Sequence, residues 1–151
     1  MARLQAGDVA GWLIKSTRDP SGIDPDWAPG AVRDLTRCVR RSYRLALVSP
    51  GQPVVLWVSG RVAPGVHAVG TVTGPPREPD DPAADDRPVL PVRLTRLVAP
   101  VERSELLHDP LFRDAEVLRM PAGSNPSWLT AAQLGTVLGR AGLPVLGPWA
   151  P

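Results

Sequence analysis

The segment Gly11–Thr17 (GWLIKST) restricts the possible folds of this chain more than any other, because its apolar residues fall on both faces of an extended backbone. A strand of this kind must be covered on both sides. The segment ends in Lys15, the only lysine of the chain, followed by Ser16 and Thr17. We therefore expect a strand from about Val9 to Ser16 whose polar end lines a base-binding or anion-binding pocket.

A second segment, Pro53–Ser59 (PVVLWVS), is also apolar on both faces and rich in β-branched residues, which predicts a central strand. Val66–Thr73 follows across a glycine-bounded connection and is expected to be its hairpin partner. Within it, Gly70 permits either a bulge or the close approach of another backbone. The two segments therefore predict a hairpin at the centre of a sheet.

A third long strand is expected over Val89–Val98, where apolar and polar residues alternate until the pattern slips around Leu97 and Val98. Pro91 lies inside this segment and cannot donate a hydrogen bond to a neighbouring strand. We therefore expect Val89–Val98 at an edge of the sheet or at a bulge. Its inward-pointing side chains are expected to be Leu90, Val92 and Leu94.

The segment Ala31–Leu47 fits two structures. As a helix it would place its apolar residues on one stripe, and as a loop followed by a short strand it would alternate from Cys38 to Leu45. We favour a helix to about Arg37 with an extended piece after it. In either structure the arginines of this segment form a local basic surface.

Helices are expected at Glu102–Leu107 and from Thr130 to about Arg140. The second has the clearer signal, because Thr130 and Gln133 have the spacing of a capping box. Glu116–Met120 is a further strand candidate. Together the segments predict an α+β fold of about five or six mostly antiparallel strands, built on a small, strongly curved sheet or barrel with two or three short helices.

The length of 151 residues predicts a single domain over residues 1–151. Residues 74–88 are rich in proline and carry a net charge of −3, so we expect a mobile acidic loop that leaves about +5 on the rest of the chain. Residues 142–151 are expected to form a tail rich in glycine and proline. With no apolar run of membrane-spanning length and no export signal, we expect a cytoplasmic protein without a membrane partner.

Metal, cofactor and catalytic sites are not indicated. The two histidines, His67 and His108, lack the spacing of a metal-binding pair, and the single cysteine, Cys38, is more typical of a small, partly buried residue than of a nucleophile. The chain contains neither a phosphate-binding glycine loop nor a GxSxG motif. Its acidic residues gather in the 74–88 loop rather than in a catalytic pair. We therefore expect no metal, no cofactor and no enzymatic activity.

The tryptophans and arginines are the remaining candidates for binding. Trp12 and Trp128 are expected in the core, whereas Trp27 lies in a loop between prolines, where it could contact a ligand. Trp57 is interpreted either as core or as a pocket wall. Aromatic planes can stack on nucleobases, and arginines can contact phosphates. These residues therefore favour a polyanionic partner.

Four segments resemble, in this order, the EVE domain and its relatives in the PUA-like superfamily, which include the YTH readers. They are GWLIKST, PGQPVVLWVSG, VHAVGTVTG and GSNPSWLT, and the match covers most of the chain. In those domains a strand ending in Lys-Ser leads to the pocket, which here corresponds to Lys15 and Ser16. Arg37 stands where those domains typically have a tryptophan, so Trp27 is the alternative source of an aromatic plane.

The resemblance implies a PUA-like pseudobarrel that binds a modified base of DNA or RNA in an aromatic-walled pocket, without catalysing a reaction. The ligand-binding residues that follow are Lys15, Ser16, Thr17, Trp27, Trp57, Ser59 and Asn125, and the phosphate contacts are Arg40, Arg41 and Arg44. Two other functions stay open. One is a protein-interaction module, and the other is a small enzyme that acts on a nucleotide-like substrate with His67, His108 or a loop carboxylate as its base.

Overall fold

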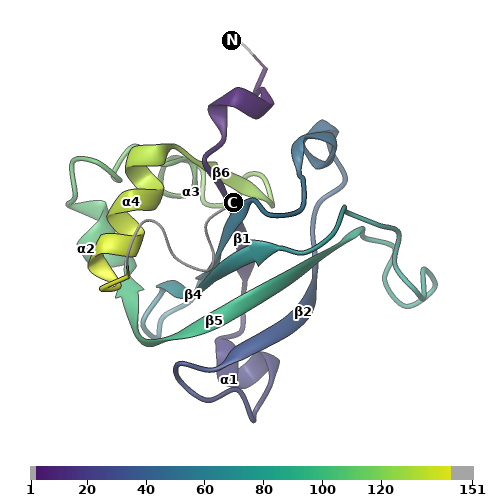
Figure 1. Ribbon diagram of the computed structural model, residues 1–151, viewed down its shortest axis with the longest axis horizontal. Coiled ribbons are helices and arrows are strands. Elements are labelled where there is room, and N and C mark those ends of the chain that lie inside the picture. The colour runs from purple at the N-terminus through teal and green to yellow at the C-terminus, as the bar shows by residue number, and fades with distance from the viewer. Residues whose placement is uncertain (1–2, 144–151) are drawn as a thin grey trace.

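The computed structural model describes residues 3–143 as a curved six-stranded sheet with short helices around it (Figure 1). Across the sheet the strand order is β2-β5-β4-β3-β1-β6. The strands are β1 (Gly11–Ser16), β2 (Val32–Cys38), β3 (Pro53–Val58), β4 (Gly65–Val72), β5 (Val89–Glu102) and β6 (Ser127–Leu129). The helices are α1 (Pro20–Ile23), α2 (Arg103–Leu107), α3 (Glu116–Arg119) and α4 (Ala131–Arg140), with 3-10 turns at Ala6–Asp8 and Tyr43–Leu47.

The fold class is α+β, as predicted. Neighbouring strands are antiparallel except β1 and β3, which run parallel. The sheet keeps two edges, β2 and β6, so in the described part of the chain it is an open curved sheet and not a closed barrel.

The two segments predicted to be apolar on both faces lie in the interior of the sheet, β1 between β3 and β6 and β3 between β1 and β4. All six residues of β3 are buried, and Trp12 of β1 is fully buried. Alternate residues enter two apolar clusters on opposite faces of the sheet. One cluster contains Leu13 and Val55, and the other contains Ile14 and Leu56. Burial on both faces confirms the prediction for these strands.

Helices α2, α3 and α4 gather at one end of the sheet (Figure 1) and contribute Leu106, Val117 and Val137 to the first cluster. The predicted helix at the C-terminal side, α4, begins with the expected capping box. Thr130 Oγ1 accepts from the Gln133 N–H at 3.2 Å, and Gln133 Oε1 accepts from the Thr130 N–H at 2.9 Å. The short helix predicted near residue 102 is α2.

The β4–β5 pair contains a close backbone approach at Gly70, one of the two possibilities that the sequence leaves open. A Cβ atom at this position would overlap the carbonyl oxygen of Arg93 on β5, so only glycine allows the two backbones to meet. Further along, the register shifts between Val66 and Ala68, opposite residues 97–100 of β5. The slip predicted in the alternation of β5 coincides with this irregular stretch.

β5 is longer and more central than predicted. Leu90, Val92 and Leu94 are fully buried, as expected. However, β5 pairs with β4 on one side and β2 on the other, so the edge position inferred from Pro91 is wrong. Proline is accommodated because it lies just beyond the last β5 residue that pairs with β4, where its carbonyl still accepts from the Thr73 N–H at 3.0 Å.

The helix predicted to about Arg37 is also wrong, because this segment forms the edge strand β2. It pairs antiparallel with β5 along its whole length. Leu35 packs against the second apolar cluster, and exposed Asp34 forms an ion pair with Arg93 of β5 at 2.8 Å. Pairing with β5 determines the structure of this segment more than the helical spacing of its apolar residues does, since strand formation depends on cross-strand neighbours.

The strand candidate Glu116–Met120 is a single turn of helix, α3. The Met120 N–H donates to the Glu116 carbonyl at 2.7 Å, which closes the turn. The short strand in this region lies later, at β6, where Trp128 pairs with Trp12 of β1.

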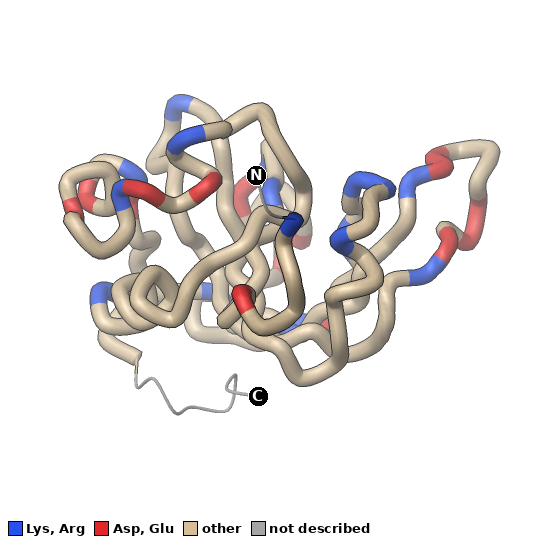
Figure 2. Tube along the Cα trace, turned by 90° about the horizontal axis from the view of Figure 1, so that it is seen from above, with Lys and Arg blue, Asp and Glu red and all other residues tan. Residues whose placement is uncertain are grey.

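The acidic loop, residues 74–88, projects from the sheet at the side away from the helices, and acidic and basic positions gather along it (Figures 1 and 2). One isolated bridge, Arg77 to Val89, joins it to the start of β5. Its mobility stays a prediction. Most of the tail expected at residues 142–151 lies outside the described residues. No described helix has the length and apolar character needed to cross a membrane.

Candidate anion-binding pocket

The polar end of β1 lies beside the end of β3. The two strands run parallel, so their carboxyl ends meet at the same edge of the sheet. Ser59, directly after β3, donates from its N–H to the Ser16 carbonyl oxygen at 2.9 Å, and its hydroxyl group donates to the same oxygen at 3.3 Å. The parallel pairing therefore joins Lys15, Ser16 and Thr17 to Ser59, as the sequence interpretation required.

A pocket of about 570 Å³ opens at this edge, a volume within the range typical of small-molecule sites. Its other walls come from the end of β2 and from the segment between α3 and β6. The lining residues are Lys15, Ser16, Thr17, Arg18, Thr36, Arg37, Cys38, Arg40, Ser59, Arg87, Pro121, Ala122, Gly123 and Asn125. Five of the seven predicted ligand-binding residues and one predicted phosphate contact, Arg40, therefore lie in one place.

Asn125 connects the walls of the pocket. Its side-chain oxygen accepts from the Lys15 N–H at 3.2 Å, and its side-chain amide donates to the Cys38 carbonyl at 3.4 Å. Its own carbonyl accepts from the Arg40 N–H at 2.6 Å. The Lys15 ammonium donates to the Pro121 carbonyl at 3.1 Å. Asn125 therefore holds the ends of β1 and β2 together in addition to lining the pocket.

Ser16 has a supporting role. Its side chain is buried, donates to the Arg18 carbonyl at 2.7 Å and accepts from the Arg18 N–H at 3.1 Å. It also accepts from Arg37 Nη2 at 3.2 Å. Because these bonds occupy the hydroxyl group, we expect Ser16 to orient Arg37 at the pocket rather than to contact a ligand.

The pocket is strongly cationic. Five of its fourteen lining residues are Lys or Arg, and none is Asp, Glu, His or aromatic. Burial lowers the pKa of Lys15, Glu116 opposes this effect, and nearby arginines lower the pKa further. Burial also lowers the pKa of Arg37, and the neighbouring charge of Arg18 adds to the effect. The negative charge of a bound anion would offset both the cost of desolvating these groups and their mutual repulsion.

Arg87 differs from the other four cations. Its guanidinium forms an ion pair with Asp85 at 2.6 Å. Among residues 3–143, Lys15, Arg18, Arg37 and Arg40 form no ion pair. These four side chains therefore keep their charge available to a ligand.

Trp27 does not reach the pocket, contrary to the prediction that a base stacks on it. The side chain is fully buried in the second apolar cluster, and its indole N–H donates to the Ala31 carbonyl at 2.8 Å. Its carbonyl accepts from Arg96 on β5. The loop between β1 and β2 therefore places the Trp27 side chain inside the second apolar cluster, where it forms part of the core.

Trp57 is also a core residue and not a pocket wall. It is 4% exposed and stacks on Phe112, with ring centroids 6.4 Å apart and planes 7° from parallel. Residues of β3 alternate between the two faces, and Trp57 enters the cluster beneath the helices. The aromatic-walled pocket predicted from the tryptophans is therefore absent at this edge.

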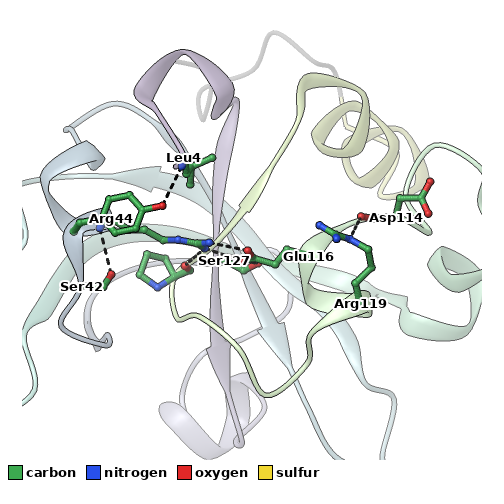
Figure 3. A network of polar contacts seen from close by, with 9 residues as sticks. Leu4, Ser42, Arg44, Asp114, Glu116, Arg119 and Ser127 are labelled. Atoms are coloured by element: carbon green, nitrogen blue, oxygen red, sulfur yellow. Dashed lines mark hydrogen bonds and ion pairs between the residues drawn. The ribbon is translucent and has the colours of Figure 1, made fainter. Parts of the chain in front are cut away.

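Arg44 and Arg41, two predicted phosphate contacts, are paired with carboxylates. Arg44 makes a two-pronged bond to Glu116, with both distances 2.7 Å, and also donates to the Pro126 carbonyl at 3.2 Å (Figure 3). The two charged side chains are only 12% and 10% exposed. Arg41 binds Glu78 of the acidic loop at 2.6 Å. Neither arginine lines the pocket, because each guanidinium is bonded to a carboxylate from a distant segment of the chain.

The two histidines lie outside the pocket lining. His67 Nε2 lies 2.6 Å from the Ala63 carbonyl in the connection before β4, and His108 ends α2. Neither side chain lines the pocket.

Several lining residues were not predicted as site residues: Arg18, Thr36, Cys38, Arg87 and residues 121–123. Arg18 directly follows the polar end of β1, so its position beside Thr17 was a usable signal. The others come from β2, the acidic loop and the segment after α3. No local pattern in the sequence connects these segments to β1.

Comparison with known proteins supports the fold. No protein-family model matches the chain, and no curated protein sequence matches it. A hypothetical protein from Leishmania major has a TM-score of 0.68 at 16% identity, covering 91% of this chain and 98% of that one. A protein from Rhodopseudomonas palustris has a TM-score of 0.65 at 20% identity, with 89% and 94% covered. A Pseudomonas putida protein gives 0.64 at 17%, with 87% and 99% covered. At these identities the similarity establishes a shared fold alone.

Proposed function

We propose that this chain is a non-catalytic nucleic-acid-binding domain of the EVE and PUA-like kind, and that its pocket receives one nucleotide of a DNA or RNA strand. The observation that carries the proposal is the gathering of Lys15, Thr17, Ser59 and Asn125 in a single pocket lined by four arginines and no carboxylate. Such a pocket has the charge to neutralise phosphate and neutral groups for hydrogen bonds to a base.

The pocket offers a different stacking partner from the one expected. Arg37 stands where the resembled domains typically have a tryptophan, and it lines the pocket. A guanidinium plane can stack on an unstacked base much as an aromatic ring does. Since Ser16 fixes Arg37 Nη2 at 3.2 Å, we assign the base-stacking role to Arg37 in place of Trp27 and Trp57.

The sheet is compatible with the proposed family. It is curved and mostly antiparallel, and its one parallel pair puts the lysine end of β1 beside the serine that follows β3. We propose that the open curved sheet is a PUA-like pseudobarrel. Selectivity for a modified base is the part of the proposal that comes from the resemblance.

The experiment is a titration of fluorescently labelled single-stranded and duplex oligonucleotides, with unmodified and modified bases, followed by anisotropy. We expect saturable binding that weakens as salt is raised, because released counterions drive much of the affinity. Arg37→Gln should weaken binding, whereas Arg113→Gln, which removes an exposed arginine outside the pocket, should not. Absence of binding to every oligonucleotide at low salt would contradict the proposal.

A further inference from the structure

The charge in the pocket is larger than one internal phosphodiester needs. Four cations, Lys15, Arg18, Arg37 and Arg40, line the pocket without an ion-pair partner among residues 3–143. A phosphodiester in a nucleic-acid strand carries a single negative charge. A phosphomonoester carries about −1.5 to −2 at neutral pH and three strong acceptor oxygens. The number of unpaired cations therefore matches a monoester better than a diester.

Two of these cations are held in place before a ligand arrives. Arg37 is bonded to the buried hydroxyl group of Ser16 at 3.2 Å, and the Lys15 ammonium donates to the Pro121 carbonyl at 3.1 Å. Preorganised donors lose little conformational freedom on binding, and a guanidinium fork matches the geometry of phosphate oxygens. The pKa values of Lys15 and Arg37, lowered by burial, indicate that both charges are poorly compensated without an anion.

We propose that the pocket binds a phosphomonoester dianion whose principal contacts are Lys15 and the N–H edge of Arg37, while the face of the Arg37 guanidinium stacks on the base of the attached nucleoside. This ligand occurs at the phosphorylated end of a nucleic-acid strand and in a free nucleoside monophosphate. The strand-end source rests on the proposed function, whereas the preference for a monoester does not.

The experiment compares ligands that differ only in the terminal phosphate. Single-stranded oligonucleotides of one sequence, with a 5′-phosphate, a 3′-phosphate or free hydroxyl ends, are titrated at fixed salt. Adenosine monophosphate, adenosine and inorganic phosphate serve as competitors. We expect a terminal phosphate to raise affinity about tenfold or more, the effect of one or two added charge-assisted hydrogen bonds. We also expect adenosine monophosphate to compete where adenosine does not.

Variants assign the effect to the pocket. Arg37→Gln and Lys15→Gln should each abolish most of the preference for a phosphorylated end. Arg113→Gln removes the same charge from an exposed position outside the pocket and should retain it. Ser16→Ala, which frees Arg37, should reduce the preference while leaving both charges present. Unfolding curves of all four variants verify that each protein is folded.

The outcomes separate the two proposals. Equal affinity for phosphorylated and hydroxyl ends would overturn the monoester inference and leave the proposed function standing. Binding of adenosine monophosphate without binding of any oligonucleotide would support the inference and overturn the proposed function. If neither oligonucleotides nor monophosphates bind at low salt, both are overturned. A preference retained in both Arg37→Gln and Lys15→Gln would also overturn the inference, because the phosphate would then bind elsewhere.

Discussion

Arg40 and Arg44 lie four residues apart, yet the structure uses them in opposite ways. Arg40 is exposed, lines the pocket and has no carboxylate partner among the described residues. Arg44 is nearly buried and bonded through both Nη atoms to Glu116, which also accepts from the Ser127 hydroxyl at 2.8 Å (Figure 3). The same residue type therefore lines a pocket without a charged partner in one region and completes a nearly buried ion pair in the other. What separates them is whether a carboxylate from a distant segment reaches the guanidinium.

Trp27→Ala gives the largest expected effect and tests whether the interior is separate from the pocket. Removing a fully buried indole should lower the free energy of unfolding by about 4 kcal/mol, through lost burial and the cavity that remains. Denaturant unfolding measures this loss. At a temperature where the variant is folded, its oligonucleotide affinity should equal that of the wild type. If the folded variant no longer binds oligonucleotides, Trp27 takes part in binding.

Arg44→Met tests the buried pair. It leaves the Glu116 carboxylate without its main partner, and breaking a buried pair in this way should cost about 3 kcal/mol of unfolding free energy. The double variant Arg44→Met/Glu116→Leu should recover much of that loss, because no charge then stays buried alone. Oligonucleotide affinity should be unchanged in the folded single variant. A large loss of affinity with normal stability would place Arg44 among the binding residues.

The pH dependence of the free energy of unfolding tests whether the Arg44–Glu116 pair stabilises the fold. Burial acts to raise the pKa of Glu116, but hydrogen bonds from Arg44 and Ser127 and the nearby positive charges outweigh it, so the pKa is lowered on folding. Such a carboxyl group stabilises the fold above its unfolded pKa of about 4.3, and the contribution disappears as pH falls through the lower folded value. Denaturant unfolding from pH 6 to pH 3 should therefore show a steeper loss of stability in the wild type than in Glu116→Gln. Equal slopes would show that this pair contributes nothing to acid sensitivity.

Arg40→Gln and Arg41→Gln form a matched pair with the smallest expected effects. Arg40 is free to contact phosphate, so its replacement should weaken binding severalfold and reduce the slope of log affinity against log salt by about one. Arg41 is already bonded to Glu78 and to the Asp86 carbonyl, so its replacement should change binding less. Anisotropy titrations at several salt concentrations distinguish the two. Identical losses would mean that the acidic loop releases Arg41 to the ligand.

Where sequence prediction succeeded, the responsible forces act locally or through burial pattern. Double-sided apolar character placed β1 and β3 inside the sheet, and the spacing of Thr130 and Gln133 located the start of α4. Gly70 indicated a close approach because only an absent side chain tolerates one. The polar end of β1 indicated a pocket, although the other walls of that pocket come from distant segments.

Where prediction failed, the deciding contacts join distant segments. β2 became a strand because β5, some sixty residues later, supplied a pairing edge. Trp27 had the sequence context of an exposed loop residue, but the curvature of the sheet gave it an apolar cavity to fill. In both cases the local sequence preference was outweighed by strand pairing or burial that exists only in the folded protein.

The sequence by itself determined that β1 and β3 are interior strands, where α4 begins, and that a lone lysine with two hydroxyl residues ends the first strand. Only the tertiary structure decided which arginines remain available to an anion, since Glu116 reaches Arg44 across 72 positions and Glu78 reaches Arg41 across 37. Pairing of charges depends on distance in space and on burial, and neither can be read from the order of residues along the chain.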